Sequence, residues 1–175
     1  MKYQIIGGKE LEGCINIRGA KNAALRLIAG ILIANGEVIL NDVPLISDVN
    51  FKLNILCEIG ATIYYLEDRK IMINTCSIST GNIENGYGIR TTILLLPGLL
   101  VRFKKCRVPV PTGDKIGPRS HDMHINALSL MGVSFNINDD FIEASCDQLV
   151  GIDYTFRQKS VGATQNIIIA AILAN

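Results

Sequence analysis

A repeat of about seventy residues is the feature that most constrains how this chain folds. The segment Ile55–Ile63 matches Ala127–Phe135, 72 positions later. In both copies an apolar helical stretch ends at a glycine, Gly60 or Gly132, which suits the left-handed conformation that commonly closes a helix. In both copies alternating residues then follow, as expected for strands. The chain is therefore built from repeated supersecondary units rather than from one irregular domain.

Each unit is predicted to run helix, strand, helix, strand, strand. Short acidic turns between alternating segments indicate a β-hairpin at the end of each unit. The predicted first helices are Asn22–Asn35, Thr91–Arg102 and Gly162–Asn175. The predicted strands are Glu37–Leu40, Thr62–Leu66 and Lys70–Asn74 in the first unit, and Arg107–Val110, Ser134–Asn138 and Phe141–Ser145 in the second.

The third unit contains only its first helix before the sequence stops at Asn175. A helix without the strands of its unit cannot bury its apolar side. We therefore expect the chain to be truncated relative to its own pattern, with exposed apolar surface along Ile167–Leu173. Such a surface favours self-association or a second chain as partner.

Composition and sequence patterning disfavour several classes of protein. The 175 residues carry a formal net charge of +1, whereas a nucleic-acid binder that relies on bulk electrostatics is far more basic. The apolar runs Ala23–Ala34 and Ile93–Val101 are interrupted and fall short of the ~20 residues that cross a bilayer. The N-terminus lacks the apolar length of a signal peptide. The five cysteines form no C-x-x-C pair, so we expect free thiols in a reducing compartment, the cytoplasm. From the charge and the short apolar runs we expect neither nucleic-acid nor membrane partners.

A first polar island, Arg18–Ala24, lies at the start of the first predicted helix. Small residues let a ligand approach the backbone, a helix N-terminus favours anions, and Lys21 adds a point charge suited to phosphate or carboxylate. A solvated lysine beside a helix start explains the same pattern. Spacing alone leaves both interpretations open.

A second polar island, Pro111–His124, lies between a predicted strand and a predicted helix. It is rich in Gly, Pro and charge, so it is either a flexible surface loop or a lid over an anionic ligand. His121 and His124 are spaced for one helical face, but a metal site needs a third ligand and the sequence offers no convincing one. We expect no metal here, and Asp122 is predicted to cap a helix.

Three ordered motifs in these islands resemble those of the UDP-N-acetylglucosamine enolpyruvyltransferases, the 1-carboxyvinyltransferases that open peptidoglycan synthesis. Gly19–Leu25 reads G-A-K-N-A-A-L, Gly113–Arg119 is similar to the catalytic loop G-[CD]-x-I-G-x-R, and Ser160–Ile167 matches S-V-G-A-T-x-N-I. Asp122-x-His124 fits the D-x-H that follows the loop, and Arg90 fits the arginine of an M-R-A-S stretch. A shikimate-pathway enolpyruvyltransferase shares the fold, but its N-terminal signature differs from Lys21-Asn22.

The resemblance implies an α/β (α+β) fold of the enolpyruvyltransferase type, an inside-out α/β barrel built from βαβαββ units of about 70 residues, with the third unit incomplete here. It implies that residues 1–20 belong to a second domain that is absent, and that residues 21–175 form most of one domain. The units would span about 21–88, 89–158 and, in part, 159–175.

The resemblance also implies a reaction that needs no cofactor. The enolpyruvyl group of phosphoenolpyruvate would pass to the 3-hydroxyl of UDP-N-acetylglucosamine, with release of phosphate. Lys21 and Arg119 would hold phosphoenolpyruvate with help from Arg90, and Asn22 would contact the sugar nucleotide. The uridine and diphosphate end would be lined by Asp122, Ser160, Val161 and Gly162. Asp114 stands at the general-acid position, where most members of the family have Cys.

Departures from the family pattern leave alternatives open. Ser120, His121, Gln158 and Lys159 differ from the usual residues near the uridine end, and the family chain is more than twice as long. We therefore expect the isolated chain to lack turnover. The alternatives are a non-catalytic UDP-sugar-binding or structural module, or one half of a split enzyme completed by another polypeptide.

Overall fold

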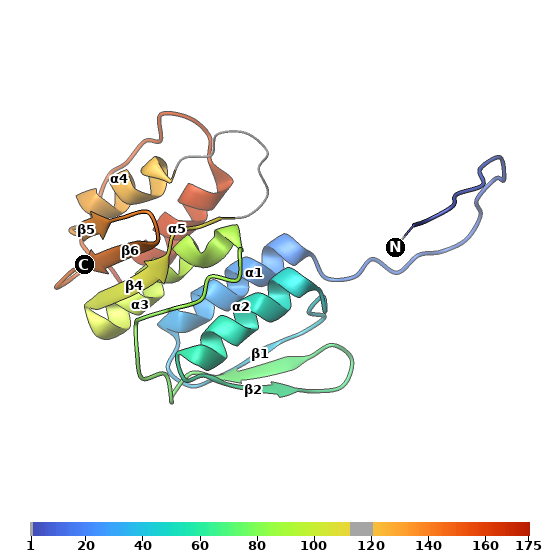
Figure 1. Cartoon of the computed structure of the whole chain (residues 1–175), viewed down its shortest axis with the longest axis horizontal. Coiled ribbons are helices and arrows are strands. Elements are labelled where there is room, and N and C mark those ends of the chain that lie inside the picture. Colours follow the sequence, from blue (N-terminus) through green and yellow to red (C-terminus); the bar gives the residue numbers. More distant parts are fainter. Residues whose placement is uncertain (1, 113–120) are drawn as a thin grey trace.

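The computed structural model describes residues 2–112 and 121–175, and it contains the repeat (Figure 1). The first unit is formed by α1 (Lys21–Gly30), the 3-10 helix η1 (Ile31–Ile33), β1 (Glu37–Leu40), α2 (Ser47–Glu58), β2 (Thr62–Tyr65) and β3 (Ile71–Asn74). The second is formed by the 3-10 helix η2 (Arg90–Leu95), α3 (Leu96–Phe103), β4 (Lys105–Pro109), α4 (Asp122–Leu130), β5 (Ser134–Ile137) and β6 (Phe141–Ser145). The third begins with α5 (Val161–Ala171).

Each complete unit folds its three strands into one antiparallel sheet, in which the last strand lies between the other two. The orders are β1-β3-β2 and β4-β6-β5. The pairing is equivalent in the two units, with Val38 opposite Ile73 in the first sheet and Val108 opposite Ile142 in the second. The predicted left-handed glycines are also present, since φ is +110° at Gly60 and +95° at Gly132. Both units therefore follow the predicted repeat.

The core lies where the first helices of the three units meet. α1 and α5 both contact η2, while α3 packs against η1 and α5. In Figure 1, α1 and α2 lie over one face of the first sheet, whose other face exposes Ile39 and Tyr64. Gly98 of α3 allows a close approach to η1, because a Cβ there would lie 2.4 Å from the Cβ of Leu32. The helices therefore form the interior and the sheets lie outside them.

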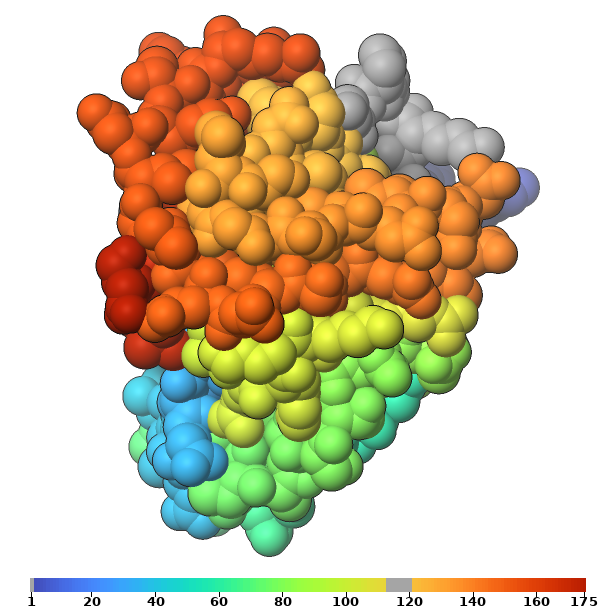
Figure 2. All heavy atoms as spheres, turned by 90° about the vertical axis from the view of Figure 1, so that its left-hand side faces the viewer, coloured from blue at the N-terminus to red at the C-terminus, as the bar shows by residue number. Residues whose placement is uncertain are grey.

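The expected α+β architecture is thus present, with two differences of detail. The described residues do not close into a barrel. The helix predicted over Thr91–Arg102, at the start of the second unit, divides into η2 and α3, because Pro97 has no N–H to continue a regular helical hydrogen-bond pattern. On the face shown in Figure 2, the second unit (yellow to orange) is stacked on the first (blue to green).

The segment 2–20 and the end of α5 are among the described regions that expose apolar side chains. Residues 2–20 contain no helix or strand and extend away from the folded body (Figure 1). On α5 and just beyond it, Ile168, Ile172 and Leu173 are exposed, whereas Ala170 is fully buried. Part of the apolar surface expected along Ile167–Leu173 is therefore present. Within residues 2–112 and 121–175, no helix combines the length and the apolar character that crossing a membrane requires.

Candidate functional site

A cavity of about 900 Å³ lies where several helices begin. It is lined by residues from the first turns of α1, η2 and α4 and by the residues that open α5. The N–H groups of a helix's first turn have no partners within the helix, and the helix dipole makes this end positive. A ligand in this cavity therefore meets several positive helix ends, which favours an anion.

The repeat explains why these helix starts converge. Lys21, Arg90 and Val161 are the first residues of α1, η2 and α5, and all three line the cavity. Because each unit begins with an equivalent helix, equivalent positions face one shared space. Ser160 precedes α5 and caps it, since its Oγ accepts a hydrogen bond from the backbone N–H of Ala163 at 3.3 Å. The third motif therefore acts locally as a helix start.

Lys21 is held at the cavity by an acidic residue from the neighbouring helix. Its Nζ lies 2.9 Å from Oδ2 of Asp48, which stands in the first turn of α2. Both side chains are partly exposed and both line the cavity. The structure thus gives Lys21 a defined position at the opening rather than a place on a remote surface.

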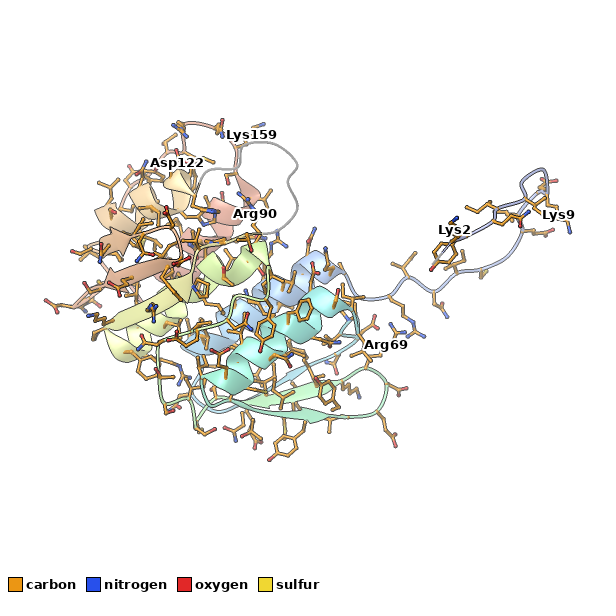
Figure 3. The ribbon with its side chains drawn as sticks, viewed as in Figure 1. Lys2, Lys9, Arg69, Arg90, Asp122 and Lys159 are labelled. Atoms are coloured by element: carbon orange, nitrogen blue, oxygen red, sulfur yellow. The ribbon has the colours of Figure 1, made fainter. Side chains whose placement is uncertain are left out.

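Asp122 differs from its sequence-based prediction. It is the first residue of α4, not the residue that caps this helix, and the side chain of the N-cap residue, His121, makes no capping hydrogen bond. The Asp122 carboxylate instead forms an ion pair with Arg157, which also lines the cavity. Figure 3 shows Asp122, Arg90 and Lys159 in the same part of the molecule, far from Lys2 and Lys9 on the N-terminal segment.

The two histidines lie in the cavity wall. Nδ1 of His124 lies 3.2 Å from the amide nitrogen of Asn166, so it accepts a hydrogen bond and its proton is on Nε2. Burial, together with the positive charges of His121 and Arg90, lowers the pKa of His124 to about 4. Burial also lowers the pKa of His121. Within the described residues, His, Cys, Asp and Glu do not form a cluster of three that could hold a metal ion.

Two cations, one in the cavity wall and one buried behind it, were missed by sequence reasoning. Arg26 lines the wall, donates to the carbonyl oxygen of Asn22 at 2.5 Å and bonds the side chain of Gln165 on α5. Lys52 of α2 is completely buried behind it and donates to the carbonyl oxygen of Thr91 at 2.5 Å. The four-residue spacing of Asn22 and Arg26 could have indicated a shared helix face, but nothing local marks Lys52.

The cavity gathers seven of the nine residues singled out from the sequence. Asp114 and Arg119 lie outside the described residues. The seven that line the cavity are Lys21, Asn22, Arg90, Asp122, Ser160, Val161 and Gly162. The arrangement can bind a ligand that carries negative charge, and the roles of the individual residues stay predictions.

The fold and the cavity define a class of protein. A sequence profile of the EPSP synthase (3-phosphoshikimate 1-carboxyvinyltransferase) family matches residues 5–175, and the chain belongs to this family. Among curated relatives, the UDP-N-acetylglucosamine 1-carboxyvinyltransferase of Aliarcobacter butzleri is 37% identical over 179 residues, and that of Acinetobacter baylyi is 38% identical over 176. These alignments cover 100% and 99% of this chain but 42% of each relative.

Solved structures share the fold. The enolpyruvyl transferase NikO from Streptomyces tendae superposes with a TM-score of 0.78 at 19% identity, over 96% of this chain and 40% of that one. An EPSP synthase from Acinetobacter baumannii gives a TM-score of 0.67 at 20% identity, over 93% of this chain and 38% of that one. The chain therefore has the enolpyruvyl transferase fold and spans about two fifths of the length of these proteins.

Proposed function

We propose that this chain supplies one side of the active site of a UDP-N-acetylglucosamine enolpyruvyltransferase, an enzyme of the first committed step of peptidoglycan synthesis. The observation that supports the proposal is the convergence of Lys21, Arg90 and the start of α5 on one cavity of about 900 Å³. The curated relatives that carry this activity by name align with the whole chain.

The proposed substrates are phosphoenolpyruvate and UDP-N-acetylglucosamine. Lys21, Arg90 and Arg119 would bind the phosphate and carboxylate of phosphoenolpyruvate, because a multiply charged anion needs several fixed cations. Asn22 would contact the sugar nucleotide. Its uridine and diphosphate end would meet Asp122, Ser160, Val161 and Gly162. These assignments follow the family motifs, and the shared cavity supports them for the seven described residues.

The proposed reaction is an addition followed by an elimination. The 3-hydroxyl of the sugar gives up its proton to solvent and its oxygen forms a bond to C2 of phosphoenolpyruvate, while Asp114 delivers a proton to C3. Transfer of a proton from C3 back to the Asp114 carboxylate then expels phosphate from C2 and leaves the enolpyruvyl ether. Fixed cations and helix N-termini stabilise the charge on the departing phosphate. Asp114 must be protonated at the start of this reaction, although an ordinary aspartate has a pKa of about 3.9.

We further propose that residues 1–20 belong with a second domain and that residues 21–175 form most of one domain. The segment 2–20 has no helix or strand and extends away from the body, which supports this division. Because the chain spans 42% of the length of its relatives, we expect it to bind substrate without turnover. We propose a cytoplasmic location, where the substrates of this pathway step are made.

A calorimetric titration with UDP-N-acetylglucosamine tests the proposal. We expect saturable binding that Asn22→Ala and Asp122→Asn, at two positions assigned to the sugar nucleotide, each weaken about tenfold, which corresponds to ~1.4 kcal/mol. Arg69→Gln is the matched control, since Arg69 lies on the turn between β2 and β3, away from the cavity (Figure 3). A folded chain that does not bind the sugar nucleotide would contradict the proposal.

The same preparation separates the alternatives. A non-catalytic binding module would bind the sugar nucleotide but never release phosphate, whatever polypeptide is added. One half of a split enzyme would release phosphate from phosphoenolpyruvate once the chain that completes it is present. The exposed apolar residues Ile168 and Ile172 offer a surface for such a chain.

A further inference from the structure

Lys52 is a buried lysine that the proposed function does not use. Its side chain is 0% exposed in the middle of α2, and lysine is among the residues least often buried. Its Nζ donates to the backbone carbonyl of Thr91 at 2.5 Å. Thr91 follows Arg90, and Thr91 and Arg26 both line the cavity. Lys52 therefore lies directly behind the wall that carries the proposed anion-binding cation of η2.

The charges around Lys52 make its ammonium form costly in the free chain. Arg26, from α1, is the charged group that acts on it within the described residues, and it repels a second positive charge. Asp48 lies one turn earlier on α2, but its carboxylate is bonded to Lys21. Burial and Arg26 together lower the pKa of Lys52 to about 7.

Within the described residues, η2 and β2 bring no carboxylate to offset this charge. The charged residue of η2 is Arg90, a further cation, and β2 carries no charged residue along Thr62–Tyr65. The hydroxyl of Thr91 is buried and has no hydrogen-bond partner in the described part of the chain. An anion in the cavity would bring negative charge close to Arg26 and Lys52 and would favour the ammonium form of Lys52.

We propose that Lys52 is a positioning residue of the anion site: its amine anchors the start of η2 through the Thr91 carbonyl, and it takes up a proton when an anion occupies the cavity. The identity of that anion rests on the proposed function, whereas the anchor itself does not. The proton comes from solvent, and no covalent bond is made or broken. An ammonium is a stronger donor to a carbonyl than a neutral amine, so binding tightens the anchor that holds Arg90 in place.

This coupling has a defined sign. An anion that favours the ammonium form raises the pKa of Lys52, so the complex holds more protons than the free chain. Between the free and bound pKa values, affinity for the anion therefore rises as the pH falls, by at most tenfold per pH unit. Above the bound pKa this contribution to the pH dependence disappears.

Nuclear magnetic resonance of chain labelled at the lysine ε carbons tests the proposal, with phosphoenolpyruvate as the probe. The Lys52 signal is assigned from its absence in Lys52→Gln and in Lys52→Met. Its titration is followed with phosphoenolpyruvate and with chloride at equal ionic strength. We expect the midpoint to move upward by at least half a pH unit with phosphoenolpyruvate. Lys70→Met, which changes an exposed lysine before β3, should leave the Lys52 curve unchanged.

Two variants distinguish the effect of the Lys52 charge from the effect of its hydrogen bond to Thr91. Lys52→Gln retains a donor for Thr91 but cannot titrate, so it should bind phosphoenolpyruvate with a flatter pH profile. Lys52→Met loses the donor as well, so it should bind several times more weakly at every pH. A purely structural lysine would give the same pH profile in wild type and in Lys52→Gln.

The outcomes that overturn the proposal are distinct from those that overturn the function. If phosphoenolpyruvate shifts the backbone amide signal of Arg90 but leaves the Lys52 curve in place, the positioning role is wrong and the proposed function stands. A Lys52 midpoint at the ordinary lysine value would also refute it. If phosphoenolpyruvate, UDP-N-acetylglucosamine and inorganic phosphate all leave the Arg90 signal unchanged in a folded chain, both ideas fail.

Discussion

Replacing Lys52 by methionine should remove one component of the pH dependence of folding. Burial and Arg26 lower the pKa of Lys52 from 10.5 to about 7 in the folded chain. The folded state therefore binds fewer protons than the unfolded state between these values, and stability rises with pH across this window. Below a pH of about 7 the cost of the buried ammonium is present in full. Each pH unit of difference is worth about 1.4 kcal/mol, so the component reaches about 5 kcal/mol.

Lys52→Met removes the free-energy cost of the buried ammonium and places an apolar side chain there instead. The variant also leaves the Thr91 carbonyl without its donor, which costs about 1–3 kcal/mol. We therefore expect Lys52→Met to be more stable than wild type below a pH of about 7, by about 2–4 kcal/mol. Its advantage should shrink and then reverse as the pH rises toward 10.5.

Urea unfolding followed by circular dichroism at a series of pH values measures this difference. Other titrating groups are common to both chains, so their contributions cancel when the two free energies of unfolding are subtracted. Lys70→Met removes an exposed lysine and should track wild type throughout. Parallel curves for wild type and Lys52→Met across the window would refute the reasoning.

Three further predictions concern packing, capping and protonation. Gly98→Ala should lower the free energy of unfolding by about 1–3 kcal/mol in urea titrations, because the new Cβ would lie 2.4 Å from the Cβ of Leu32. Arg102→Met should cost about 2–4 kcal/mol in the same assay, because the guanidinium donates to the carbonyls of Leu32, Ala34 and Thr75. His124 should titrate with a midpoint near 4 by proton magnetic resonance, in a signal that His124→Gln removes. Its pKa lies below the ordinary 6.5, so its contribution to stability is present above that value and is lost as the pH falls toward 4.

The repeat made much of the fold predictable from the sequence. The strand Glu37–Leu40 was predicted with the bounds that the structure has, and each predicted hairpin strand lies within one residue of the observed one. These strands are determined by the local alternation of apolar and polar residues and by the turn residues between them, and both patterns can be read directly from a sequence. The start of the second unit was predicted less well, because Pro97 divides the helical segment into η2 and α3.

The site was predictable only where a motif marked it. Lys21, Arg90 and Ser160 open helices, and the structure brings them to one cavity. Arg26 and Lys52 were missed, because a charged residue on an amphipathic helix ordinarily faces solvent. Lys52 is fully buried and Arg26 is half-buried, and this follows from the contacts of α1 with α2 and with η2, which no local pattern reveals. Asp114 and Arg119 stay predictions.

Because the helix starts converge on the cavity, the residues that determine what the cavity binds are different from the residues that form the core. Duplication of one ancestral unit would place the same position of every copy around one space, so an anion site could arise before any residue specialised. Each of these positions could then change without disturbing the core. Two now carry cations, Lys21 and Arg90, whereas the third carries Val161, which is 69% exposed. That position can accept a new side chain at little cost to folding, which makes it the natural place to redirect the specificity of the cavity.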